Sequence, residues 1–183
     1  MAKQSKVVFD QTGLKVIQEA LKKMSDGGYH IQIGIFGGKT SRKNGEMTNA
    51  EIGFVHEMGS ISRNIPRRSF LWDTLSTKGK EIMESLKPAT ETLFKTGKIN
   101  EYLEVVGHAC TNMVDEAFAT GGFGKWAPLS YGTLMRKAKG NVFKRMQQVA
   151  QDLYEGGNNI AILIKSGQLR RAISYRVVGG GAS

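Results

Sequence analysis

The stretch from residue 49 to residue 75 constrains the fold most, because it reads as a helix, a short loop and a second helix. Thr48 and Glu51 have the spacing of a capping box, in which each side chain satisfies an amide that the first helical turn leaves unpaired. Gly59 ends the first helix, because glycine adopts a positive φ at little cost. The second helix opens at Phe70 with a large apolar surface.

Hydrophobic periodicity places helices and strands along the rest of the chain. Apolar residues recur at helical spacing over 14–24, 70–86, 99–117 and 143–153, and Pro88 is expected to kink or end the second of these helices. A short helix is expected to begin after Ser130, which would be its N-cap. Another helical stretch is expected after Pro88 and carries Leu93. Period-two alternation indicates half-buried strands at 29–36 and 173–178, with a further strand around 160–164.

Three of the helices carry an apolar face. In the 99–117 helix the face is a stripe with alternating steps of four and three, which suits either core packing or a seam with a neighbouring subunit. The expected faces are Ile52, Val55 and Met58 with Phe54 beside them; Ile99, Leu103, Val106, Cys110, Met113 and Ala117; and Phe143, Met146, Ala150 and Leu153.

These elements predict a single α+β domain over 1–178, in which a small, mainly antiparallel sheet is packed by several α-helices and helix clearly exceeds strand. The length of 183 residues gives one domain a sizeable core. The glycine-rich end, 179–183, is expected to be a flexible tail. No apolar run approaches the roughly 20 residues that span a bilayer, and the polar start lacks a signal core, so we expect a protein made in the cytoplasm.

The formal net charge of +10 is unevenly distributed. From residue 121 to residue 183 there are ten basic and two acidic residues. A basic C-terminal third favours a polyanion or an acidic partner surface. Solubility alone explains the same charge equally well.

Motifs that would support catalysis are incomplete. His56-Glu57 lacks the second histidine that a zinc protease needs one helical turn further on, because Ser60 occupies that position. The stretch 34–40 ends in Gly-Lys-Thr but is one residue short of a phosphate-binding loop. Cys110 lies on an apolar stripe and has no convincing histidine partner. We therefore expect no catalytic, cofactor-binding or metal-binding residues and no enzymatic activity.

Two segments resemble the neck and tail-completion proteins of tailed bacteriophages, the minor virion components that join head to tail. The first segment is His56-Glu57-Met58-Gly59 followed by Ile65-Pro66-Arg67-Arg68-Ser69-Phe70-Leu71, with Met58 where the family more often has Phe and Ser69 where it more often has Pro. The second comprises Trp126-x-x-Leu129-Ser130-x-x-Thr133-x-x-x-Lys137 and Leu163-Ile164-x-x-Gly167-x-Leu169-Arg170-x-x-Ile173-x-Tyr175, with Ser166 for the usual Thr and Ala172 for the usual Ser.

The resemblance implies a non-enzymatic structural protein, assembled in the host cytoplasm, that forms a closed ring at the head–tail junction of the virion. The implied partners are further copies of the chain, head-closure or connector proteins on one side, and tail tube or tail terminator proteins on the other. Genomic DNA would pass through the lumen, and no membrane is involved. The alternative is a basic, non-specific nucleic-acid-binding protein that acts outside the virion.

Two groups of residues are candidates for such contacts. Apolar anchors and turn residues suit subunit or partner interfaces, and arginines suit either phosphates or carboxylates of adjacent subunits, or are simply solvated. The interface candidates are His56, Glu57, Gly59, Pro66, Phe70, Trp72 and Trp126. The basic candidates for facing DNA or the lumen are Arg63, Arg67, Arg68, Lys165, Arg170 and Arg171.

Overall fold

The computed structural model describes residues 12–37, 47–138, 140–154, 163 and 167–179, which form eight helices and one two-stranded sheet. Helix far exceeds strand in this part of the chain, so the predicted α+β class is confirmed. In chain order the elements are α1 (Thr12–Asp26), β1 (His30–Ile35), α2 (Asn49–Met58), α3 (Trp72–Ser85), α4 (Lys87–Thr96), α5 (Ile99–Ala119), α6 (Tyr131–Lys137), α7 (Val142–Tyr154), α8 (Gln168–Ala172) and β2 (Ile173–Val178).

The sheet joins the two ends of the described chain. β1 and β2 pair antiparallel over their whole length, with His30 opposite Val178 and Ile35 opposite Ile173. Both strands fall where alternation predicted them. Of the expected third strand, 160–164, the structure describes Leu163 alone, which stands in a turn with a φ of 61°; the remainder lies outside the described residues, as does most of the tail.

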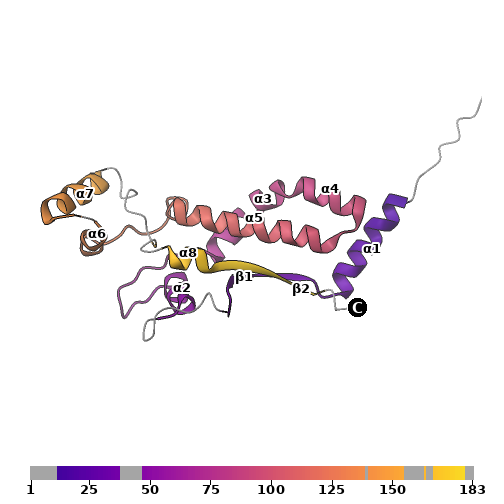
Figure 1. Ribbon diagram of the computed structural model, residues 1–183, viewed down its shortest axis with the longest axis horizontal. Coiled ribbons are helices and arrows are strands. Elements are labelled where there is room, and N and C mark those ends of the chain that lie inside the picture. The colour runs from indigo at the N-terminus through magenta and orange to yellow at the C-terminus, as the bar shows by residue number, and fades with distance from the viewer. Residues whose placement is uncertain (1–11, 38–46, 139, 155–162, 164–166, 180–183) are drawn as a thin grey trace, which may run out of the picture.

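Helix α5 is the centre of the fold. It runs along the sheet and contacts β1, β2, α3 and α4 (Figure 1). The stripe predicted on it is confirmed as core at Ile99, Leu103 and Ala117, but between these ends the buried residues are Gly107 and Val114. The ring of Tyr175 on β2 covers Gly107, and a Cβ built there would overlap that ring. The ring of Tyr175 therefore lies against the one residue of α5 that has no side chain.

Three hydrophobic clusters follow from this arrangement. The first joins α1, α4 and α5, and the second joins the segment before α3 to α5 and α8. The third lies inside the α6–α7 pair. Their buried members are Ala20, Leu93, Ile99 and Leu103; Phe70, Val114, Phe118 and Leu169; and Leu134, Ala138 and Val149.

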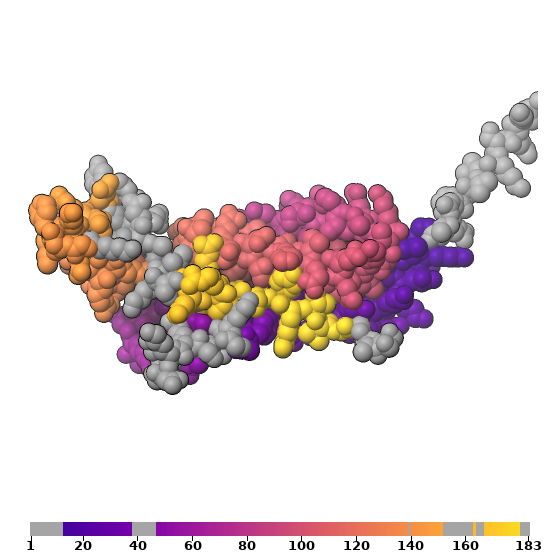
Figure 2. Space-filling view, in the orientation of Figure 1, coloured from indigo at the N-terminus to yellow at the C-terminus, as the bar shows by residue number. Residues whose placement is uncertain are grey.

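Helices α6 and α7 form an arm at one end of the elongated molecule, opposite α1 (Figures 1 and 2). The apolar face predicted for α7 is exposed where the structure describes its side chains: Phe143 and Met146 are 68% and 51% exposed, and Ala150 is exposed as well. Val149 is the residue that packs against α6. Periodicity reported an amphipathic helix correctly, but the partner helix covers a different side of it.

The helix–loop–helix segment has the predicted order with two corrections. In α2 the side chains of Phe54 and Met58 are 65% and 61% exposed, because the helix turns Asn49 and Gly53 towards the rest of the molecule. Helix α3 begins at Trp72, and Phe70 is buried just before it.

The predicted break at Pro88 is confirmed in a specific form. Helix α3 ends at Leu86, and Pro88 lies in the first turn of α4, where its missing N–H is not needed. The α3–α4 junction is therefore set by local sequence.

Gly107→Ala is expected to lower the free energy of unfolding by about 1–3 kcal/mol, because the added methyl group over-packs the contact between α5 and the Tyr175 ring. Gly79→Ala in α3 is the matched control, since no atom would lie within 4 Å of its Cβ. The control is expected to raise the free energy of unfolding by about 0.5–1 kcal/mol through helix propensity. Urea unfolding measures both variants, and equal effects would contradict the close approach.

Candidate functional site

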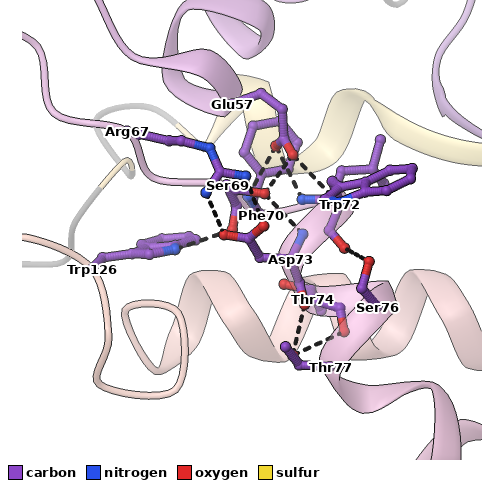
Figure 3. Close-up of polar contacts among 11 residues, drawn as sticks. Glu57, Arg67, Ser69, Phe70, Trp72, Asp73, Thr74, Ser76, Thr77 and Trp126 are labelled. Carbon is purple, nitrogen blue, oxygen red and sulfur yellow. Dashed lines mark hydrogen bonds and ion pairs between the residues drawn. The ribbon is translucent and has the colours of Figure 1, made fainter.

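Glu57, in the last turn of α2, places its carboxylate at the start of α3 (Figure 3). It accepts a hydrogen bond from the Ser69 hydroxyl and three more from backbone amides. The amides of Phe70, Leu71 and Trp72 lie 3.0, 3.1 and 2.9 Å from its oxygens. The first amides of a helix have no partner within the helix and form the positive end of its dipole. Glu57 satisfies them from another helix and so fixes α2 against α3.

Ser69 links this carboxylate to a second one. Its hydroxyl donates to Glu57 at 2.5 Å and accepts from the Asp73 amide at 2.9 Å. The Asp73 carboxylate in turn accepts two bonds of 2.7 Å from the Arg67 guanidinium. This bidentate bond lowers the pKa of Asp73 and raises the pKa of Arg67. Arg67, expected to face DNA or a neighbour, is paired within its own chain.

Trp126 brings the second resembling segment onto the first. Its indole N–H donates to the Ser69 carbonyl at 3.2 Å (Figure 3). Its ring meets Phe118 edge-on with centroids 5.7 Å apart, and Phe118 lies 5.0 Å from the Phe70 ring. Trp126 and Phe70 are therefore anchors of the chain's own core, which leaves Trp72, at 72% exposed, as the large interface candidate that faces outward.

The loop between α2 and α3 is a tight backbone structure. Gly59 has a φ of 77°, and a Cβ there would lie 2.9 Å from the Arg67 nitrogen. Beyond it Ser60 and Ile65 form a bridge with two backbone bonds, which closes the loop before Pro66. The predicted role of Gly59 as the end of α2 is confirmed.

Arg68 leaves this loop in the opposite direction from Arg67. It is 5% exposed, and its Nε and Nη2 donate to the carbonyls of Ala127 and Pro128 at 2.9 and 3.0 Å. Its backbone amide donates to the His56 carbonyl. Arg68 therefore does not lie in an open basic loop: it ties α2 to the segment before α6.

A cavity of about 670 Å³ lies beside Arg68, between α2, the loop, α6 and α8. His56 and Lys137 also line it, and His56 Nδ1 is buried with no hydrogen-bond partner in the described part of the chain. Burial, with the charges of Arg68 and Lys137, lowers the pKa of His56. Burial and Arg68 lower the pKa of Lys137. We call this cavity the cationic pocket.

The remaining basic candidates are dispersed. Arg63 is exposed on the loop. Arg170 donates to both carboxylate oxygens of Asp115 at 3.0 and 3.2 Å, and this contact raises the pKa of Arg170. Arg171 is exposed on α8, and Lys165 lies outside the described residues. Because Arg68 is buried, the five arginines among these candidates do not form one continuous surface.

The structure adds residues that sequence reasoning missed. Ser69 and Asp73 belong to the Glu57 network, Lys137 lines the cationic pocket, and Asp115 pairs with Arg170. Ser69 and Lys137 stand within the resembling segments, which was a usable signal. Asp73 and Asp115 carry no local pattern, because their partners Arg67 and Arg170 lie outside their own helices.

No protein-family model, no curated protein and no solved structure matches the chain. Within the described residues, no group of three or more His, Cys, Asp or Glu side chains could hold a metal ion. The same part of the chain contains no helix of the length and apolar character needed to cross a bilayer. The resemblance to neck proteins stays a prediction from the sequence.

Glu57→Gln is expected to lower the free energy of unfolding by about 1–3 kcal/mol, because bonds from amides to a carboxylate at a helix start are charge-assisted. Glu84→Gln, on the exposed side of α3, removes the same charge without a comparable contact and is expected to change little. Urea unfolding compares the two. Equal stabilities would contradict the capping role.

His56 is expected to make the protein less stable at mildly acidic pH. Because the folded state lowers its pKa, the unfolded chain binds a proton first as the pH falls. The contribution of neutral His56 is thus present above about pH 6.5 and lost below it. Urea midpoints across this range should fall for the wild type and for His30→Gln, but less steeply for His56→Gln. An unchanged slope in His56→Gln would contradict the prediction.

Proposed function

We propose that this chain is a structural protein of the phage head–tail junction, a neck or tail-completion component that assembles into a ring. Support comes from where the resembling residues lie. Glu57 and Phe70 of the first segment meet Trp126 of the second in one network, although the two segments are far apart in sequence. The motif residues then serve to hold one rigid corner, as a building block requires.

The observation that carries the proposal is an outer patch on this corner. Four large apolar side chains there face solvent: Phe54, Met58, Ile61 and Trp72 are 65%, 61%, 101% and 72% exposed. Exposed apolar groups gathered on a rigid support are typical of protein–protein contacts, and tryptophan is common among their strongest anchors. We name these four residues the outer patch.

Two separate apolar surfaces, at different places on the elongated molecule, support assembly in a ring. The outer patch lies on the α2–α3 corner, while the arm carries other exposed apolar residues, Phe143 and Met146, on α7. Two different apolar surfaces on one chain suit head-to-tail contacts, which close into a ring when the rotation between subunits permits. The partners would be further copies, head-closure or connector proteins and tail proteins, with DNA in the lumen. No catalysis, metal or cofactor is part of the proposal.

A second candidate is a basic nucleic-acid-binding protein that acts outside the virion. One observation favours it: from residue 121 to residue 151 the chain has six lysines and arginines and no acidic residue. Such a segment binds phosphate backbones without reading sequence. Salt-dependent DNA binding by a stable monomer, with no ring in electron micrographs, would select this function over the first.

Replacing the outer patch is expected to abolish assembly while leaving the fold intact. Phe54→Ser with Trp72→Ser removes two exposed apolar groups, so unfolding should change little, but complementation of a phage lacking the protein should fall by about tenfold or more. Leu21→Ser is the control, since Leu21 is 55% exposed on α1 at the other end of the molecule. Particle counts by electron microscopy measure joined heads and tails. Full complementation by the double variant would count against the proposal.

A further inference from the structure

The cationic pocket contains a charged group that no carboxylate in the described part of the chain neutralises. Arg68 is 5% exposed, yet in the described part of the chain its side chain bonds to two backbone carbonyls and to no carboxylate. Burying a charge is unfavourable unless an opposite charge accompanies it. Nη1 is left without a partner among the described residues, so one edge of the guanidinium can receive two oxygens of an anion.

The neighbours of Arg68 add positive potential to the same space. His56 presents a buried Nδ1 that has no hydrogen-bond partner among the described residues. Burial lowers the pKa of His56 and the pKa of Lys137, and the nearby charge of Arg68 lowers both further. No aspartate or glutamate is among the described residues that line the cavity. Arg68 and Lys137 carry like charges that repel one another, and a bound anion would relieve the repulsion.

The rest of the lining combines apolar walls with neutral polar side chains, and this favours one kind of anion. A phosphate or other compact, fully hydrated anion would leave the apolar part of these walls uncovered, whereas a carboxylate attached to an aliphatic group would bury that group against them. A DNA duplex also fits poorly, because Arg68 is buried within the pocket and does not project from the surface. Apolar side chains, Leu163 and Leu169 among them, lie there beside the polar side chains of Asn64, Ser130, Thr133 and Gln168.

We propose that the cationic pocket binds a carboxylate carried by an apolar segment of a partner protein, with Arg68 as its main contact and His56 and Lys137 beside it. The proposal deepens the function above and rests on it in taking the partner to be a protein. The pocket and the outer patch lie on different sides of α2, since His56 lines one and Phe54 belongs to the other. A partner segment could therefore occupy the pocket while the patch contacts another surface.

The test uses the full chain with isotope-labelled histidine and follows the imidazole of His56 by NMR, assigned with His56→Gln. Isocaproate supplies a carboxylate on a branched aliphatic group, and its neutral amide, isocaproamide, is the matched control. We expect isocaproate to shift the His56 signals saturably, to raise the pKa of His56, and to bind at least about tenfold more tightly than the amide. No saturable shift, or an equal response to acid and amide, would overturn the proposal.

Two further probes separate the sources of the anion. Inorganic phosphate and a short DNA duplex are titrated in the same way. Tighter binding of either one than of isocaproate would overturn the peptide carboxylate in favour of a nucleic-acid backbone. The expected result is weak phosphate binding and no duplex-dependent shift at His56.

Variants assign the binding to the pocket. Arg68→Gln is expected to reduce isocaproate affinity about tenfold or more. Because that change also removes bonds to the 127–128 carbonyls, Lys137→Gln provides a second variant that leaves those bonds intact; it is expected to weaken binding as well. Unchanged affinity in Lys137→Gln and in folded Arg68→Gln would overturn the assignment. If the cationic pocket does not bind a carboxylate, the result of the phage complementation experiment on the outer patch does not change. If the proposed function is wrong, the outer-patch double variant complements fully in that experiment.

Discussion

The hydrogen bonds from the start of α3 to the Glu57 carboxylate are the constraint on which the site depends. They set the angle between α2 and α3, and through Ser69 they also position Asp73 and its ion pair with Arg67. A helix start with no side-chain cap of its own needs an acceptor from elsewhere, and Leu71 at the N-cap position supplies none. The carboxylate of a preceding helix meets that need, at the cost of bringing a charge into a half-buried site where four donors compensate it.

The same corner separates two arginines that are adjacent in sequence. Arg67 faces outward to Asp73, whereas Arg68 turns inward to the carbonyls before α6. Successive residues in extended backbone point to opposite sides, so a loop that looks uniformly basic in sequence divides its charges between the surface and the interior. This division creates the cationic pocket, and it also removes Arg67 and Arg68 from any shared surface that could hold DNA.

The rigid corner and its exposed side chains belong together physically. Apolar residues on a mobile loop lose conformational entropy when they bind a partner. Residues on two helices that are hydrogen-bonded to each other are already ordered and lose less conformational entropy on binding. Phe54 and Trp72 sit on such a pair, held by Glu57 and by the Trp126 contact to Ser69. The arrangement suits a protein whose task is repeated attachment to neighbours, and it is consistent with the absence of a complete catalytic motif in the sequence.

The sequence by itself determined the local elements: the capping box at Thr48, the end of α2 at Gly59, the two strands and the break at Pro88 all depend on residues close together in the chain. It did not determine which side of an amphipathic helix would be buried, as α2 and α7 show. Periodicity identifies an apolar face but does not identify the element that packs against the helix. Contacts such as Glu57 with the α3 amides, Arg68 with the carbonyls before α6, and Arg170 with Asp115 were decided by tertiary structure alone. Each joins groups separated by a dozen or more residues, and the distance between such groups is set by packing, which no local pattern encodes.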